Sequence, residues 1–447
     1  MNEQKTNPLG TEKISSLLLR FAIPSIIAMV VSALYNMVDQ FFIGRSVGML
    51  GNAATNVAFP LVITCTSIAL MCGIGGAANF NLCMGRREKN EAASFAGNAI
   101  TMLFSLGVIL CIVTRLFLKP MMILFGATSS VLNYSLTYTG ITSLGFPFLI
   151  LTTGGTNLVR ADGSPKFSMA CTLTGAIINT ILDPTLIFGF HMGISGAAIA
   201  TVISQILSCI FAMTFLLGKK VPVKITFGQY NLKVIRKILS LGFSPFLILA
   251  TDSLILIFMN TVLQKYGGAS QGDMLITCAT IAQSYLLLIT SPMIGISGGT
   301  QAILSYNYGA RCVNRVKDAE RNILGVMLIF TTIMFLLSRF IPRYFVLLFT
   351  TDPQYIRFSV WVIRTYTLMI IPLSFQYVFV DGLTALECPK TGLALSVTRK
   401  SLFVISAAVL PSFFGAKAAF FAEPVADGIS SALSTVVFLL LINRHLD

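Results

Sequence analysis

The chain has 447 residues, of which 55% are hydrophobic and only 11% are charged, and its formal net charge is +14. Soluble domains carry roughly 25% charged residues, so the composition excludes a water-exposed globular protein and indicates an integral membrane protein. The basic residues gather in short polar connections between apolar stretches, which excludes nucleic acid as a partner.

Apolar stretches long enough to cross a bilayer, about 20 residues each, follow one another along the whole chain. The polar N-terminal segment runs straight into the first of them, which is too long for a signal-peptide core, so we expect it to be retained. We predict twelve spans in two sets of six. They cover 16–43, 53–83, 92–117, 131–156, 167–189 and 193–217, then 237–262, 274–306, 322–341, 357–386, 393–413 and 418–442.

The two sets match one another in sequence. Pro165-Lys166 returns 224 positions later as Pro389-Lys390, and Pro24 and Pro245 mark the first span of each set at a shift of 221. Two copies of one unit are typical of membrane transporters, in which the substrate path lies between the copies. Five further positions share the shift of 224, since Gly75, Gly85, Arg87, Asn90 and Asn98 return as Gly299, Gly309, Arg311, Asn314 and Asn322.

We therefore predict an all-α membrane fold of twelve transmembrane helices in two six-helix lobes. Six is an even number, so the second lobe should repeat the first in the same orientation, about a pseudo-twofold axis along the membrane normal. The lobes should cover 1–217 and 237–447, joined by a basic cytoplasmic linker at 218–236.

The distribution of Lys and Arg predicts the orientation. With twelve spans, 22 of the 31 basic residues fall on the side of the N-terminus and nine on the other; Arg399 and Lys400 are among the 22. The positive-inside rule then places both termini in the cytoplasm. We expect a multi-pass monomer of the inner or plasma membrane, surrounded by lipid.

Residues for chemical catalysis are not evident. The nine cysteines are scattered without a C-x-x-C pair, and His191 and His445 are isolated. We therefore expect no enzyme, no catalytic residue and no cofactor. The phosphate-binding loop G-x-x-x-x-G-K-[ST] is also missing, so energy should come from an ion gradient or from the substrate's own gradient.

Two acids lie inside predicted spans of the first set. Asp39 is near the outer end of the first span, and Asp183 is near the outer end of the fifth. Asn179 precedes Asp183 by four residues and shares its helix face, and Thr201 lies at a similar depth in the sixth span. Charge inside a membrane costs roughly 2.5–3.5 kcal/mol on insertion scales, so such acids usually have a use.

These four residues form our candidate coupling-ion site. Two carboxylates in one dry site raise each other's affinity for a proton. The same oxygens, with Asn179 and Thr201, could instead hold Na⁺. The simpler alternative is that Asp183, which precedes Pro184, only ends or kinks a helix.

The sequence resembles the multidrug and toxic compound extrusion (MATE) family. The similarity covers essentially the whole chain and rests on these segments: IP…YNMVDQFFIG, GSPK, NTILDPTLIF, GISGAAIATVISQ, GGTQAILSYNYGA and TALECPKTG. The resemblance implies a twelve-helix, two-lobed exporter that exchanges organic, often cationic, compounds for H⁺ or Na⁺. It also implies that Asp39, Asn179 and Asp183 bind the coupling ion, with Thr201 as the hydroxyl of the sixth helix and Asn157 facing the same cavity.

The second lobe differs from the first in its polar residues. Asn260 occupies the repeat position of Asp39, and no acid answers Asp183. Asp252 and Asp427 are candidate counter-charges for a cationic substrate, with hydrogen-bonded structural acids as the alternative. For Asp381, which lies near the cytoplasmic end of its span, we favour the structural role. Some family members carry a sodium-site acid higher in the tenth helix, and that acid has no equivalent here. Glu423 lies nearer the end of its span than Asp427.

Two other classes of function compete with cation-coupled export. Related two-lobed folds move lipid or lipid-linked sugars, but the intramembrane charges placed from the sequence are mainly acidic, which disfavours a phosphate headgroup. A membrane enzyme or receptor is disfavoured because no nucleophile–base arrangement or signalling domain is recognisable.

Overall fold

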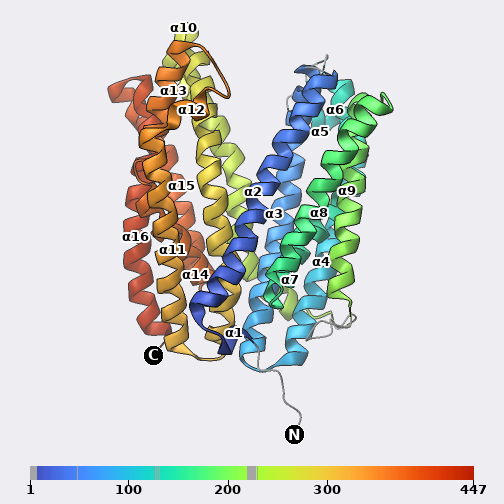
Figure 1. Ribbon diagram of the computed structural model, residues 1–447, viewed down its shortest axis with the longest axis vertical. Coiled ribbons are helices and arrows are strands. Elements are labelled where there is room, and N and C mark those ends of the chain that lie inside the picture. Colours follow the sequence, from blue (N-terminus) through green and yellow to red (C-terminus); the bar gives the residue numbers. More distant parts are fainter. Residues whose placement is uncertain are drawn as a thin grey trace. The chain divides into compact units, whose positions relative to one another are not determined.

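The computed structural model describes residues 8–47, 49–125, 127, 129, 131–218, 228 and 230–446. In this part of the chain the regular structure is helical, without a strand (Figure 1). Most of the predicted linker, residues 219–227 and 229, lies outside the described residues, as does the segment 1–7. The predicted lobe boundaries therefore stay a prediction.

Sixteen α-helices follow one another along the described residues. Three short stretches of 3₁₀- or π-helix, Ser143–Gly145, Thr185–Gly189 and Ala416–Phe421, extend neighbouring α-helices. The α-helices are α1 (Pro8–Thr11), α2 (Ile14–Val47), α3 (Met49–Gly85), α4 (Lys89–Leu116), α5 (Leu118–Leu124), α6 (Leu132–Thr142), α7 (Phe146–Ala161), α8 (Pro165–Pro184), α9 (Gly193–Leu216), α10 (Leu232–Gly309), α11 (Val313–Phe340), α12 (Pro342–Val346), α13 (Pro353–Tyr366), α14 (Ile370–Ala385), α15 (Pro389–Phe414) and α16 (Ala422–Leu446).

The predicted spans are confirmed as helices, with ends that shift by a few residues. Among the described residues, eleven helical stretches are long and apolar enough to cross a membrane, or twelve if α13 and α14 form one bent span. The bend there is 48°. Pro372 explains it, because a proline ring clashes with the carbonyl four residues earlier, at Leu368, and has no N–H to donate. The long helix α10 holds two predicted spans and is kinked at Gly268, whose φ of 64° suits glycine.

The chain forms two compact units. Unit 1 comprises Met1–Glu12, Ile23–Ala250 and Ser305–Ala310, and unit 2 comprises Lys13–Ala22, Thr251–Leu304 and Arg311–Asp447. The core of unit 1 lies where α3, α4 and α7 meet, around Cys65, Ala69 and Leu103. In unit 2, α16 packs against both α14 and α15.

Glycine allows α3 and α10 to approach closely in unit 1. A Cβ on Gly242 would lie 1.7 Å from the carbonyl oxygen of Met71, and a Cβ on Gly75 would lie 2.0 Å from that of Ile238. Because the added Cβ would meet a backbone carbonyl, the clash could be relieved only by moving the two helices apart. The glycine repeat seen in the sequence is therefore partly a packing requirement.

Substitution of Gly242 by Ala should destabilise this helix contact. Because the added methyl meets backbone atoms, we expect a cost on the order of 3 kcal/mol, at the upper end for overpacking. The melting temperature of the detergent-solubilised protein, followed by size-exclusion chromatography, measures it. Gly298→Ala is the matched control, since its Cβ would meet nothing within 4 Å. Equal melting of the two variants would contradict the packing role.

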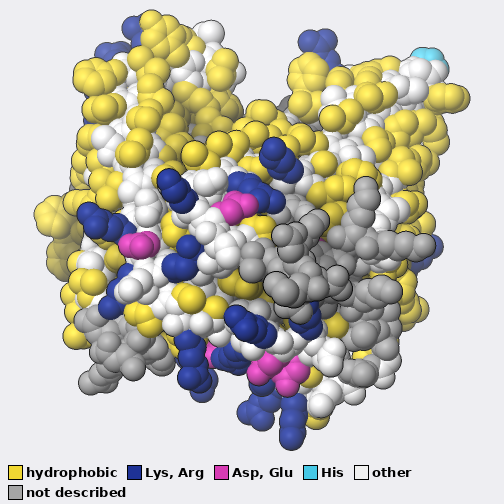
Figure 2. Space-filling view, turned by 60° about the horizontal axis from the view of Figure 1, so that its bottom comes forward, with side chains coloured by type: hydrophobic (Ala, Val, Ile, Leu, Met, Phe, Trp, Pro, Cys, Tyr) yellow, Lys and Arg dark blue, Asp and Glu magenta, His cyan; other side chains and the backbone are white. Residues whose placement is uncertain are grey.

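Side chains of different kinds separate on the surface. Figure 2 shows Lys and Arg among polar groups on the face turned forward, with large areas of hydrophobic side chains around them. Large apolar side chains such as Ile109, Ile112 and Leu440 are 53–66% exposed. Exposed apolar flanks of this kind are expected of helices in contact with lipid. They identify a multi-pass membrane protein.

Candidate functional site

The four predicted coupling-site residues come together inside unit 1. Asn179 and Asp183 lie on α8, one turn apart, and Asn179 Nδ2 donates to Asp183 Oδ1 at 3.3 Å. The same nitrogen lies 3.5 Å from Thr201 Oγ1, on α9. Asp39, on α2, is within hydrogen-bonding reach of Asp183. Three helices of unit 1 therefore contribute to one polar cluster (Figure 1).

The cluster is dry and its oxygens are incompletely satisfied. Asp183 has no exposed surface, and Asp39 keeps only 7%. Asp39 Oδ1, Asp183 Oδ2 and Asn179 Oδ1 have no hydrogen-bond partner. Within the described residues no Lys or Arg pairs with either acid. Buried carboxylate oxygens without donors are rare and costly, so the arrangement suits a bound cation or proton.

The local structure around Asp183 also fits the simpler alternative in part. α8 ends at Pro184, directly after Asp183, and a π-helical turn follows at Thr185–Gly189. A helix end does not, however, require a second acid from α2 beside it. The contact between Asp39 and Asp183 is what distinguishes a binding site from a helix terminator.

Two tyrosines complete the cluster, and sequence reasoning missed both. Tyr35 precedes Asp39 by one turn of α2, and Tyr138 comes from α6. Both hydroxyls reach Thr201, and both rings lie near the two acids. The i, i+4 spacing of Tyr35 and Asp39 was a usable signal. Tyr138 gave none, because the rotation of α6 is set by packing alone.

Asn157 is engaged in a different contact. Its Oδ1 accepts from Arg160 Nη2 at 2.8 Å, and its Nδ2 donates to the Thr153 carbonyl at 3.0 Å. Arg160 also contacts Ser25 at 3.3 Å. Both the oxygen and the nitrogen of the amide are thus engaged, so a substrate that donates to Asn157 Oδ1 competes with Arg160.

The turn after α7 contains a half-buried acid, Asp162, outside the membrane spans. Burial raises the pKa of the Asp162 carboxyl from its usual 3.8 to about 7, and its Oδ2 has no partner. Between these two values the unfolded chain has lost the proton and the folded chain has kept it. Stability conferred at low pH is therefore lost as the pH rises from about 4 to about 7.

Substitution of Asp162 by Asn should remove this pH dependence. We expect the variant to melt higher than the parent at pH 8, and the difference to vanish below about pH 3, where the parent carboxyl is largely protonated in both states. Melting curves at four pH values measure it. A constant difference across that range would contradict the assignment.

The candidate substrate-facing acids of unit 2 are paired with basic residues. Arg399 Nε donates to Asp427 Oδ1 at 2.7 Å, and Arg399 Nη2 lies 3.0 Å from Glu423 Oε1. Lys400 Nζ lies 2.7 Å from Asp252 Oδ1. These salt bridges engage the charges that we had predicted would face a cationic substrate.

We had counted Arg399 and Lys400 with the charges of the cytoplasmic side, although they fall within the predicted span 393–413. In the structure they lie inside α15, about ten residues from its start. They are stable there because acids on other helices pair with them: Asp427 and Glu423, which are largely buried, with Arg399, and the more exposed Asp252 with Lys400. Asn260, two turns after Asp252 on α10, is half-buried, and we find no hydrogen bond between it and this group in the described part of the chain.

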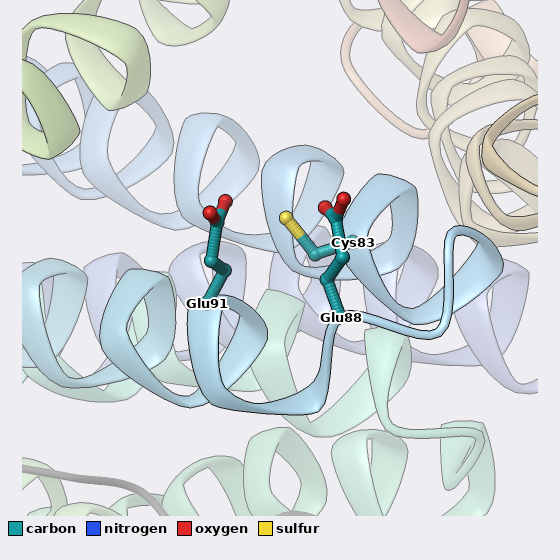
Figure 3. A group of neighbouring side chains, drawn as sticks. All are labelled: Cys83, Glu88 and Glu91. Atoms are coloured by element: carbon teal, nitrogen blue, oxygen red, sulfur yellow. The ribbon is translucent and has the colours of Figure 1, made fainter.

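A third cluster lies at the connection between α3 and α4. Cys83 Sγ and carboxylate oxygens of Glu88 and Glu91 lie within 4.8 Å of one another (Figure 3). Both glutamates are exposed and stand at the N-terminus of α4, where the helix dipole favours negative charge. This accounts for their position without an ion.

The fold and the buried acidic cluster together define a membrane transporter. A family model described as MatE matches residues 24–185 and 247–410. The chain therefore belongs to the MatE family, the MATE transporters, as its motifs had indicated. The two matched segments fall in the two sets of spans predicted from the repeat.

Relatives and solved structures agree with this assignment. The multidrug export protein MepA of Staphylococcus haemolyticus is 22% identical over 446 residues, covering 99% of this chain and 97% of that protein. The FAD transporter of Shewanella oneidensis is 26% identical, covering 93% and 92%. An outward-facing multidrug resistance MATE family transporter has the same fold, with a TM-score of 0.92, 20% identity, and coverage of 100% and 99%. A transporter from Pyrococcus furiosus, with a binding pocket of reverse polarity, gives 0.91, 20% identity and full coverage of both chains. The twelve-helix, two-lobed fold class is thereby confirmed.

Proposed function

We propose that this protein is a cation-coupled antiporter that exports organic, often cationic, compounds, with H⁺ or Na⁺ as the coupling ion. The observation that supports it is the contact between Asp39 and Asp183 in the interior of unit 1, with an unpartnered oxygen on each. Two acids without a basic partner cannot stay ionised cheaply in a dry site. They need a cation, and an ion gradient supplies one.

The geometry suggests how the ion would be coupled to movement. The cluster joins α2, α8 and α9 through Asp39, Asp183 and Thr201. A bound cation neutralises repulsion between the two acids and draws these helices together, whereas its release favours an arrangement in which the acids separate or are hydrated. An ion that binds the two arrangements unequally shifts their populations, and the same linkage changes the affinity for substrate.

The charges of unit 2 favour a cationic over an anionic substrate. Its ionic group holds Arg399 and Lys400 against Asp252, Glu423 and Asp427, so the group carries one more negative than positive charge when all five are ionised. The MepA relative is a multidrug export protein, which agrees with export of organic compounds. The FAD transporter shows that a relative moves an anionic compound, and therefore both charges belong in the test.

Reconstituted vesicles test the proposal. Efflux of tetraphenylphosphonium is measured under an imposed pH gradient, an imposed Na⁺ gradient, both, or neither. We expect efflux to depend on one of the two ion gradients. Efflux without either gradient, or preferential binding of a lipid-linked phosphate over the organic cation, would contradict the proposal and favour a flippase.

A further inference from the structure

A second buried acidic pair lies in unit 2, away from the salt bridges of α15. Glu320 comes from the second turn of α11 and is only 4% exposed. Asp381 lies one turn before the end of α14. The hydroxyl of Ser297, on α10, donates to the Asp381 carboxylate and lies 3.1 Å from the Tyr377 carbonyl. Ser297 and Asp381 are thus in direct contact, and the carboxylate of Glu320 packs against Gly382, the residue that follows Asp381, close enough for the charge of Asp381 to act on it.

The carboxylate of Glu320 is unpartnered. Neither Oε1 nor Oε2 has a hydrogen-bond partner, although the side chain is almost completely buried. By contrast, Glu423 and Asp427, the largely buried acids of α16, both pair with Arg399. A buried charge with neither donor nor counter-ion is among the most costly groups in a protein. The carboxylate of Glu320 therefore lacks the donor or cation that would compensate its charge.

The backbone makes room for this carboxylate. A Cβ on Gly382 would lie 2.0 Å from Glu320 Oε1 and 3.3 Å from the ring of Phe438. The carboxylate consequently occupies the space that any other residue at 382 would fill. Phe438, 3% exposed, closes that side against the surroundings. The site is shaped for the acid and is sheltered by an aromatic ring.

The repeat shows that the fold does not need these charges. At the shift of 224, the counterparts of Glu320, Asp381 and Ser297 in unit 1 are Ala96, Asn157 and Gly73. Ala96 is buried in an apolar core, and Gly73 packs closely on the backbone of Gly154. The same framework is thus built without an acid in the first copy. The acids of the second copy call for an explanation other than packing.

We propose that Glu320, Asp381 and Ser297 form a second cation site, located in unit 2, that takes Na⁺. All its ligands are oxygens, which suit a hard cation. A proton shared by the two acids would need a hydrogen bond between them, and Glu320 makes none. The three side chains offer at most five oxygens, fewer than the six to eight that Ca²⁺ takes. This inference goes beyond the proposed export function and does not depend on the Asp39 site.

Equilibrium binding of ²²Na⁺ to the purified full-length protein, against choline, tests the site without any transported drug. Asp39→Asn combined with Asp183→Asn serves as the background, so that the cluster of unit 1 does not contribute. In this background we expect saturable binding of one Na⁺. Glu320→Gln and Asp381→Asn should each weaken it at least about tenfold, as loss of a charged ligand costs about 1.5–3 kcal/mol.

Two further variants separate ligand loss from misfolding. Gly382→Ala keeps every oxygen but displaces Glu320, and it should also weaken binding, as should Ser297→Ala. Glu88→Gln is the matched control, because that glutamate is exposed, and it should bind as the background does. The inference is overturned if the background binds no Na⁺, if it binds only Ca²⁺ or H⁺, or if Glu320→Gln and Asp381→Asn bind as tightly as Glu88→Gln. Failure of this test leaves drug export at the Asp39 site unaffected, so the two proposals fail separately.

Discussion

Substitution of Asp183 by Asn is expected to uncouple efflux from the ion gradient while leaving the fold intact. The amide keeps the size of the carboxylate and its contact with Asn179 but removes the charge that would attract a cation. Because a hydrogen bond or ligand contact to a charged group is worth about 1.5–3 kcal/mol, affinity for the coupling ion should fall about tenfold to a hundredfold. Gradient-driven efflux of tetraphenylphosphonium from vesicles measures the loss.

Companion variants make this result specific. Asp39→Asn should have a similar effect, because the two acids share the site, and Thr201→Ala a smaller one, because it removes only a neutral oxygen. Asp318→Asn, an exposed acid near the start of α11, is the matched control and should transport as the parent does. Undiminished coupling in both Asp39→Asn and Asp183→Asn would exclude the proposed ion site.

Substitution of Arg399 by Gln is expected to have the largest effect on stability. It leaves Asp427, which has no exposed surface, and Glu423, whose side chain is 13% exposed, without their cation. Breaking a buried ion pair by removing one partner costs about 3–5 kcal/mol, since the remaining charge stays desolvated. The melting temperature in detergent should fall accordingly. Arg343→Gln, at an exposed position of α12, is the control and should change little.

A second substitution should recover part of this loss. Arg399→Gln combined with Asp427→Asn removes both members of the closest pair, so less uncompensated charge remains and the protein should melt above the single variant. With Asp427→Asn measured alone as well, the effect of the double variant minus the sum of the two single effects gives the coupling energy. If the double variant melts lower still, by the sum of the two single effects, the salt bridge contributes nothing.

These salt bridges also bear on how substrates could be recognised. Asp252 and Asp427 can serve as counter-charges for an organic cation only when Lys400 or Arg399 moves away from them. We had expected both acids to face the cavity with free charges. A substrate must therefore replace a basic side chain that is already paired with the acid. Less water has to be removed from the acid, but the substrate competes with that basic side chain for it.

Sequence alone determined the class of fold and much of the candidate site. Spans are predictable because the bilayer requires about 20 apolar residues for each helix, whatever the neighbouring helices are. Likewise, Asn179 and Asp183 share a face through the helical period, and Asp39 and Thr201 stand at a similar depth in their own spans. Rare charges in an apolar sequence are conspicuous, which explains why these four residues were found.

Tertiary structure decided which charges meet. Glu320 stands near the end of its span in a polar sequence, VNRVKDAERN, so nothing in the sequence distinguishes it from a solvated acid. Arg399 and Lys400 were counted with the charges of the cytoplasmic side, and nothing in the predicted span 393–413 indicated which acids they meet. Depth along a helix can be read from residue number, but the rotation of a helix and the identity of its neighbours depend on packing against other segments. For that reason the sequence predicted a polar site in unit 1, whereas only the folded chain revealed the salt bridges of α15 and the unpartnered carboxylate of Glu320 beside Asp381.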